Sequence, residues 1–190
     1  MQKKIKAQLK ESIEIKDLVI ENLIPQIESA AKLMIDALKK KNKVLFFGNG
    51  GSAADAQHLA AELVGRYLKE RKALPAIALT TDSSVITSWS NDHGFETLFA
   101  RQIEGLGKAG DVAFGISTSG NSKNVLEGLK KAGELGCKTI GLLGCDGGSI
   151  SKIVDLAITV PCRSTPRIQE SHITIGHIIC GLIEEELFGQ

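Results

Sequence analysis

Short apolar runs alternate with segments of helical periodicity along most of this chain. The runs predict five strands, at residues 43–47, 76–80, 111–117, 138–143 and 156–160. Between and after them, apolar residues recur every three or four positions and predict helices at 52–67, 83–106 (interrupted at 91–94), 122–135, 149–153 and 166–187. Strands that are apolar throughout and alternate with helices are typical of a parallel sheet covered on both faces. The pattern therefore predicts an α/β fold, a three-layer sandwich with a five-stranded parallel sheet.

The N-terminal part of the chain is helical in pattern and precedes the first strand. Residues 3–24 carry apolar side chains at helical spacing among charges, and Pro25 suits the first turn of a second helix that continues to Leu38. No linker rich in Gly, Pro or Ser follows. We therefore expect one domain of 190 residues, with a helical extension (1–40) that adds to a subunit interface and an α/β core (41–190).

The composition excludes several classes of partner. Lys and Arg number 23 against 22 Asp and Glu, so the basic excess that marks a nucleic-acid-binding surface is missing. The four cysteines form no CxxC pair and lie mostly in apolar stretches, which predicts buried reduced thiols. The sequence shows no apolar stretch of membrane-spanning length and no signal-peptide core in its first residues. We expect a cytoplasmic protein that binds neither nucleic acid nor membrane.

A glycine-rich loop follows the first predicted strand. It reads Asn49-Gly50-Gly51-Ser52, in which the glycines allow a tight turn and Ser52 is expected to cap the next helix. Backbone N–H groups at such a helix start favour anions or sugar oxygens. Ligands of parallel sheets bind at the carboxyl ends of the strands, where the strand order reverses.

This loop also matches the dinucleotide fingerprint at Gly48-x-Gly50-x-x-Ala53. That fingerprint needs an acidic residue at the end of the next strand, roughly 20 residues on, to hold a ribose. Here the next strand ends later, at two threonines followed by Asp82. We therefore expect no nucleotide cofactor.

A second loop, after the third predicted strand, is rich in hydroxyl groups. It reads Ser117-Thr118-Ser119-Gly120-Asn121-Ser122, and Ser122 can cap the following helix. Several hydroxyl donors at a helix N-terminus suit a phosphate, although an ordinary hydroxyl-rich turn has the same composition. The loop lacks the lysine of a nucleotide-triphosphate-binding loop, which disfavours triphosphate hydrolysis.

The two loops are accompanied by helical positions that can carry acid–base chemistry. His58 and Glu62 lie one turn apart on one helix face. Arg66, a further turn on, either orients the Glu62 carboxylate, contacts substrate or forms a simple ion pair.

Two further polar segments are candidates on the same grounds. The last helix carries Gln169, His172 and His177, which either line a cleft or consist of one exposed and one core histidine. Asn91 and Asp92 either form a turn or offer groups to a polyol.

Four of these segments together resemble the sugar isomerase (SIS) domain family. They read FGNGGSAADAQHLAAELVGRY at 47–67, NDHGF at 91–95, GISTSGNS at 115–122 and PRIQESHI at 166–173, followed by His177. The resemblance covers residues 1–187 and implies a homotetramer with active sites between subunits. It implies an aldose–ketose isomerase that converts sedoheptulose 7-phosphate to D-glycero-D-manno-heptose 7-phosphate through an enediol, the first step toward heptose precursors of the lipopolysaccharide core.

The resemblance also assigns roles to individual residues. Substrate would be bound by Asn49, Gly50, Gly51, Asn91, Asp92, Ser117, Thr118, Ser119, Ser122 and Gln169, and we add Ser52, Glu62 and Arg66 as candidates. The serines would hold the phosphate, and Glu62 and His177 match the acid–base pair. One Zn²⁺ per subunit would be held by His58, Glu62, Gln169 and His177. Pro166 stands where some relatives carry an acidic residue near the substrate, so this departure questions a direct contact at this position but not the activity.

The main alternative is a non-catalytic interaction protein of the replication-initiator-associating type. That relative has a similar fold and similar loops but lacks the glutamate and the histidine of the acid–base pair. Because Glu62 and His177 are both present here, the sequence favours the enzyme.

Overall fold

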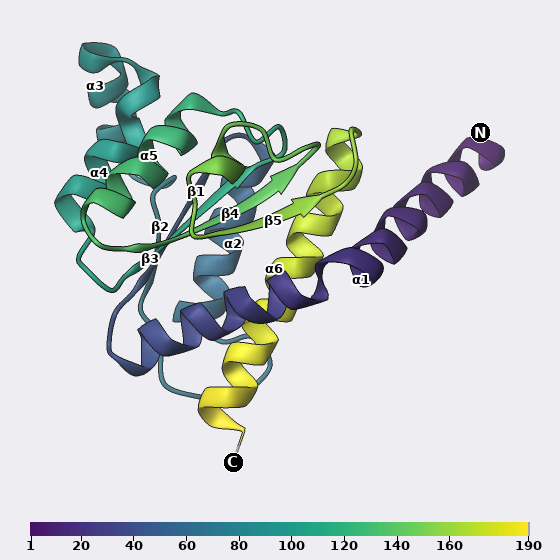
Figure 1. Cartoon of the computed structure of the whole chain (residues 1–190), viewed down its shortest axis with the longest axis horizontal. Coiled ribbons are helices and arrows are strands. Elements are labelled where there is room, and N and C mark those ends of the chain that lie inside the picture. The colour runs from purple at the N-terminus through teal and green to yellow at the C-terminus, as the bar shows by residue number, and fades with distance from the viewer. Residues whose placement is uncertain (190) are drawn as a thin grey trace.

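The computed structural model describes residues 1–189 and shows a parallel sheet between two layers of helices (Figure 1). The strands are β1 (Val44–Gly48), β2 (Ala76–Ala78), β3 (Val112–Ser117), β4 (Lys138–Gly144) and β5 (Leu156–Val160). The helices are α1 (Gln2–Lys39), α2 (Gly51–Val64), α3 (Ser83–His93), α4 (Leu98–Leu106), α5 (Lys123–Glu134) and α6 (Thr165–Phe188), with short 3₁₀ turns at η1 (Phe95–Thr97) and η2 (Ile150–Lys152). All five predicted strands are confirmed, and β2 is shorter than expected.

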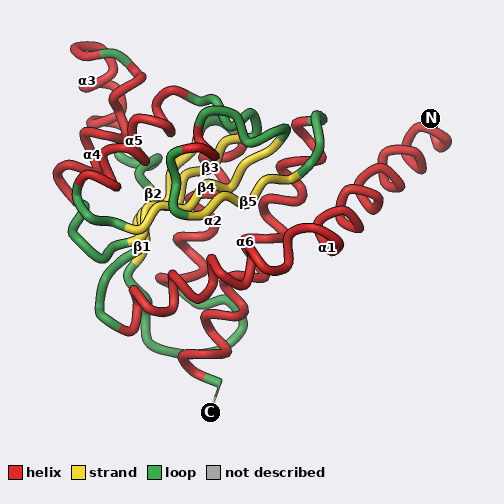
Figure 2. Tube along the Cα trace, viewed as in Figure 1, coloured by secondary structure: helices red, strands yellow, loops and turns green. Residues whose placement is uncertain are grey.

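The five strands run parallel in the order β2-β1-β3-β4-β5 and form the middle layer (Figure 2). Alternate residues of β1 enter different cores. Val44 and Phe46 pack toward α1, α2 and α6, whereas Leu45 and Phe47 pack toward α4 and α5. This confirms the predicted three-layer sandwich. The strand order reverses between β1 and β3, so the loops that follow these two strands open at the same edge of the sheet.

The expectation of two N-terminal helices is wrong, because α1 is one continuous helix of 38 residues with Pro25 inside it. Proline removes one backbone hydrogen bond and normally ends or kinks a helix. Here the apolar side chains on both sides of it, such as Leu23 and Ile27, are buried in the same core. Packing of α1 against α6 and β5 therefore outweighs the local loss.

Two other boundaries differ from the sequence pattern. The interruption expected at 91–94 is confirmed only at its last residue, because α3 continues through Asn91 and Asp92 to His93 and ends at Gly94, which adopts φ 89°. The short helix expected at 149–153 is the 3₁₀ turn η2. The helix before Gly94 and the turn η2 are both too short for the spacing of their apolar residues to show where they end.

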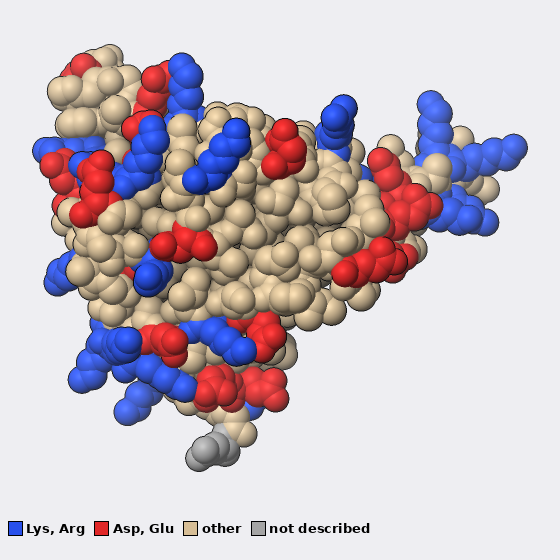
Figure 3. Space-filling view, viewed as in Figure 1, with Lys and Arg blue, Asp and Glu red and all other residues tan. Residues whose placement is uncertain are grey.

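Charged side chains are spread over the surface without a stripe of one sign on the face shown in Figure 3. Among residues 1–189, no helix is both long and apolar enough to cross a membrane. All four cysteines are free, and Cys137 and Cys180 are buried. Burial raises the pKa of the Cys180 thiol to about 12, so this thiol is protonated and unreactive at neutral pH.

His172 is the core histidine that the sequence pattern allowed. Its side chain is fully buried on α6, and its Nε2 lies 2.9 Å from the carbonyl oxygen of Leu143. Since a carbonyl only accepts, Nε2 carries the proton, and Nδ1 is buried without a partner in the described structure. Burial lowers the pKa of His172 from 6.5 to about 4, and the bond to Leu143 only partly opposes this shift.

We expect His172 to make the fold acid-sensitive. As the pH falls from 6.5 to about 4, the unfolded chain takes up a proton that the folded chain excludes, so stability is lost across this window. The full loss corresponds to roughly 3 kcal/mol. Urea unfolding at pH 7 and pH 5, at fixed protein concentration, should show a weaker pH dependence for His172→Gln than for wild type. The exposed His93→Gln should behave like wild type; an unchanged dependence in His172→Gln would contradict the assignment.

Candidate active site

The close approach of α2 and α6 creates the candidate site. A Cβ atom on Gly176 would lie 2.5 Å from Cδ2 of Leu59, so glycine at position 176 lets the Leu59 side chain pack directly against α6. The residues next to this contact along the chain are His58 on α2 and His177 on α6. The tight helix contact therefore brings the two imidazole rings together although 119 positions separate them.

Three side chains converge at this seam. The Nε2 atoms of His58 and His177 are 2.8 Å apart, and Oε1 of Glu62 lies 3.1 Å from Nε2 of His58. One potential ligand atom from each of the three residues lies within 4.8 Å of the others. Two histidines and a glutamate form a donor set typical of catalytic zinc, which keeps a position open for substrate. The cluster therefore fits the metal that the resemblance implies.

Asp55 is a neighbour of this cluster that sequence reasoning missed. It lies on α2 one turn before His58, is only 8% exposed, and its Oδ2 is buried without a hydrogen-bond partner among the described residues. Burial raises the pKa of the Asp55 carboxyl, while a hydrogen bond from Gln169 and the nearby His58 and His177 oppose this rise. Asp55 could have been found from the sequence, because its spacing from His58 and Glu62 places all three on one helix face.

The loop after β1 joins this cluster to the sheet edge. Gly50, with φ 54°, is the N-cap of α2, so the expectation that Ser52 caps this helix is wrong; Ser52 lies buried inside its first turn. A Cβ atom on Gly51 would lie 2.2 Å from Nε2 of Gln169, so the Gln169 amide packs directly over the Gly51 backbone. The structure thus places Gln169 both against this loop and beside Asp55.

Asn49 is held by a partner that the sequence did not suggest. Its amide and the amide of Asn124, on the first turn of α5, exchange two hydrogen bonds of 2.8 Å each. Asn124 is buried, so this pair locks the loop after β1 to the start of α5.

The hydroxyl-rich loop after β3 gathers its serines. Oγ of Ser117 lies 2.9 Å from Oγ of Ser122 and 3.5 Å from Oγ of Ser119. Ser122 is the N-cap of α5 as expected, but its hydroxyl bonds no helical N–H. Thr118 contributes its carbonyl oxygen to Sγ of Cys145, 3.7 Å away. Clustered hydroxyls at a helix N-terminus can hold a phosphate.

The structure does not bring every predicted residue into this cluster. Asn91 and Asp92 are exposed on α3, which lies at the periphery away from α2 and α6 (Figure 1). Among the described residues, Arg66 pairs with Glu70 at 2.8 Å rather than with Glu62. The ion pair with Glu62 that the sequence allowed is therefore not formed among these residues.

Comparisons with known proteins show the family of this chain. The SIS domain family matches residues 9–144. The chain is 57% identical to the phosphoheptose isomerase of Geotalea daltonii over 190 residues, which covers 100% of this chain and 99% of the relative. The solved phosphoheptose isomerases of Neisseria gonorrhoeae (45% identity, TM-score 0.93) and Francisella tularensis (38%, 0.94) each cover 97% of this chain and are covered to 98%. The chain therefore belongs to the phosphoheptose isomerases of the SIS domain family.

Proposed function

We propose that this chain isomerises sedoheptulose 7-phosphate to D-glycero-D-manno-heptose 7-phosphate through an enediol, and so supplies heptose precursors for the lipopolysaccharide core. One observation carries the proposal beyond family membership. The Glu62 carboxylate and the His177 imidazole, which are the groups that acid–base isomerisation needs, lie in one cluster with His58. The non-catalytic relative lacks both of these groups.

Glu62 and His177 divide the proton transfers. Glu62 removes a proton from C1 of the ketose and returns it to C2, while His177 moves a proton between the two neighbouring oxygens. Oε1 of Glu62 faces His58, which leaves Oε2 for the carbon-bound proton. Hydrogen moves only within the substrate, so the balanced reaction requires no nucleotide cofactor.

The two loops at the sheet edge bind and orient the substrate. Ser117, Ser119 and Ser122 offer clustered hydroxyls to the phosphate at the N-terminus of α5. In this proposal Thr118 and the backbone of Gly50 and Gly51 bind the adjoining oxygens. Asn49 and Ser52 complete this loop, and the fixed phosphate sets the distance from the loop to the reacting carbons.

We infer that His58, Glu62, His177 and Gln169 hold one Zn²⁺ per subunit. The first three fit by the spacing of their ligand atoms, and Gln169 by its place beside Asp55. When bound, the ion supplies a Lewis acid that polarises the substrate carbonyl. A ligated carboxylate is a weaker base, so Glu62 depends on its second oxygen for proton transfer.

We further infer a homotetramer in the cytoplasm, with active sites completed between subunits. The exposed side of α1 supports association, because its apolar side chains follow one helical stripe and are 55–62% exposed: Ile5, Leu9, Ile13, Ile20 and Ile24. Asn91 and Asp92 lie far from the cluster of their own subunit, which suits a role in the site of a neighbouring subunit. Arg66 is exposed and suits the same role. Light scattering measures this assembly. Free cysteines are the state expected in a reducing compartment.

Incubation with sedoheptulose 7-phosphate tests the activity. We expect the aldose phosphate to form, with much slower conversion of unphosphorylated sedoheptulose because the serine loop has nothing to hold. The reaction is run after chelation and with added zinc, and the metal content of wild type and His58→Gln is measured in parallel. Absence of turnover under both conditions would exclude the isomerase and leave the binding protein.

A further inference from the structure

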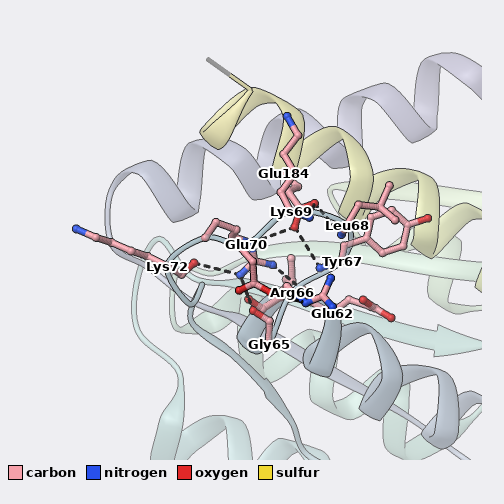
Figure 4. Close-up of polar contacts among 11 residues, drawn as sticks. Glu62, Gly65, Arg66, Tyr67, Leu68, Lys69, Glu70, Lys72 and Glu184 are labelled. Atoms are coloured by element: carbon pink, nitrogen blue, oxygen red, sulfur yellow. Dashed lines mark hydrogen bonds and ion pairs between the residues drawn. The ribbon is translucent and has the colours of Figure 1, made fainter.

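One face of α6 carries more than His177. Gly181 and Glu184 follow it by four and seven residues, so the three positions lie on the same side of the helix. The segment that leaves the end of α2, residues 65–72, lies on this face (Figure 4).

The ring of Tyr67 lies flat beside the ring of His177. The ring centroids are 5.7 Å apart and the planes differ by 28°, which is a stacked arrangement. A Cβ atom on Gly181 would lie 3.3 Å from Cε1 of Tyr67, so a larger residue there would push the tyrosine ring aside. Glycine at this position thus makes room for the ring next to His177.

The backbone of Tyr67 is held by a buried carboxylate. Glu184, 2% exposed, accepts hydrogen bonds from the backbone N–H groups of Tyr67 (3.1 Å), Leu68 (2.8 Å) and Lys69 (2.6 Å). Nε of Arg71 donates to the same carboxylate at 3.2 Å. Burial opposes ionisation, but these donors hold the pKa of Glu184 below its usual value, so it stays charged.

Arg71 also connects Glu184 to α2, the helix that carries the candidate base Glu62. Its Nη2 donates to the carbonyl oxygen of Glu62 at 2.7 Å, and its Nη1 donates to that of Leu63 at 2.7 Å. The buried Arg71–Glu184 pair therefore ties the end of α2, the segment around Tyr67 and α6 into one unit. Both ends of that unit carry groups of the candidate active site.

We propose that Tyr67 is a positioning residue that holds the imidazole of His177 toward His58 and Glu62, and that Glu184 and Arg71 fix Tyr67 for this task. The proposal rests on the isomerase function for its effect on turnover, but the ring contact itself exists independently of it. The contact uses the face of the ring, so the phenol hydroxyl is dispensable. Phenylalanine should therefore replace Tyr67, and a residue without a ring should not.

Steady-state kinetics of Tyr67→Leu and Tyr67→Phe test this directly. A displacement of about 1 Å at a reacting group lowers rates by up to roughly a hundredfold, so we expect kcat of Tyr67→Leu to fall between about tenfold and a hundredfold. KM should change little, because the phosphate loop follows β3 and does not contact this segment. Tyr67→Phe should keep kcat close to wild type. Equal losses in both variants, or a loss confined to KM, would overturn the proposal.

A spectroscopic measurement separates this proposal from the activity. In metal-free protein labelled at histidine Cε1, the four histidine signals are assigned with single His→Gln variants. Removal of the neighbouring ring in Tyr67→Leu should shift the His177 signal and leave that of His93 in place, whereas Tyr67→Phe should preserve both. An unmoved His177 signal refutes the contact even if the enzyme is active. A shifted signal in a protein that shows no turnover either after chelation or with added zinc supports the contact and refutes the isomerase.

A double-mutant cycle tests the part of Gly181. Gly181→Ala should lower kcat less than Tyr67→Leu does, because the ring must move only slightly. In the Tyr67→Leu background it should have almost no further effect, since no ring remains to displace. Gly133→Ala on α5 is the matched control, because a Cβ there meets no atom within 4 Å. Additive effects of the two substitutions would show that Gly181 does not act through Tyr67.

Discussion

Replacing Glu62 by glutamine is expected to lower kcat for sedoheptulose 7-phosphate by at least about a hundredfold, the usual contribution of a positioned general base. The amide has the size of the carboxylate and can still bond His58, whose Nε2 lies 3.1 Å from Oε1 in wild type. It cannot accept a proton from carbon, so the loss falls on the chemical step. The thermal midpoint should change little, because the substitution keeps shape and removes no buried ion pair.

The measurement compares initial rates and melting curves with those of Glu104→Gln. Glu104 is exposed on α4, in the opposite helix layer, where it pairs with Arg101 at the surface. This control should match wild type in both assays. Retention of near wild-type turnover by Glu62→Gln would show that the base is another group, with His177 and Asp55 the nearest candidates.

Alanine at Gly120 should both destabilise the fold and impair phosphate binding. Gly120 adopts φ 66°, and a Cβ atom there would lie 2.2 Å from the carbonyl oxygen of Gly147. The obstacle is backbone, so the loop after β3 must move away from the loop after β4. Left-handed strain and the clash together predict a loss of about 2 to 4 kcal/mol in the free energy of unfolding.

Urea unfolding and inhibition by inorganic phosphate measure the two effects of Gly120→Ala. Weaker inhibition is expected because Ser119 and Ser122 flank the displaced glycine. Gly133→Ala makes the same chemical change where φ is ordinary and space is open, and should be neutral or slightly stabilising. If Gly120→Ala unfolded at the wild-type urea concentration, the close packing of these two loops would be refuted.

The strands were predictable because the sheet is covered on both faces. Val44 to Phe47 are all buried, so the sequence shows an unbroken apolar run that no exposed helix would carry. The edge strand β2 is only partly buried, and its C-terminal end was placed two residues too late. The error at Pro25 has a tertiary cause, since the packing of α1 on α6 and β5 is invisible in local propensity.

Site residues on the same helix or in a known motif could be predicted from the sequence. Contacts between residues on different helices or loops could not. The i, i+4 spacing placed His58 and Glu62 together, whereas His177 was assigned by resemblance and joins them through Leu59 and Gly176. Asn124 and Tyr67 carried no signal of their own. Each acts through a partner more than 70 positions away in the chain.

The contact between α2 and α6 also determines when, during synthesis, the candidate active site can be completed. The ribosome makes the phosphate loop, the glycine loop and Glu62 long before His177, and α6 is the last helix of the described chain. Until α6 docks, Leu59 cannot pack against Gly176, and Glu184 cannot accept hydrogen bonds from the segment around Tyr67. A chain in which α6 has not docked therefore lacks the complete candidate site, because His177 has not joined His58 and Glu62. We therefore expect turnover to begin only after α6 has docked.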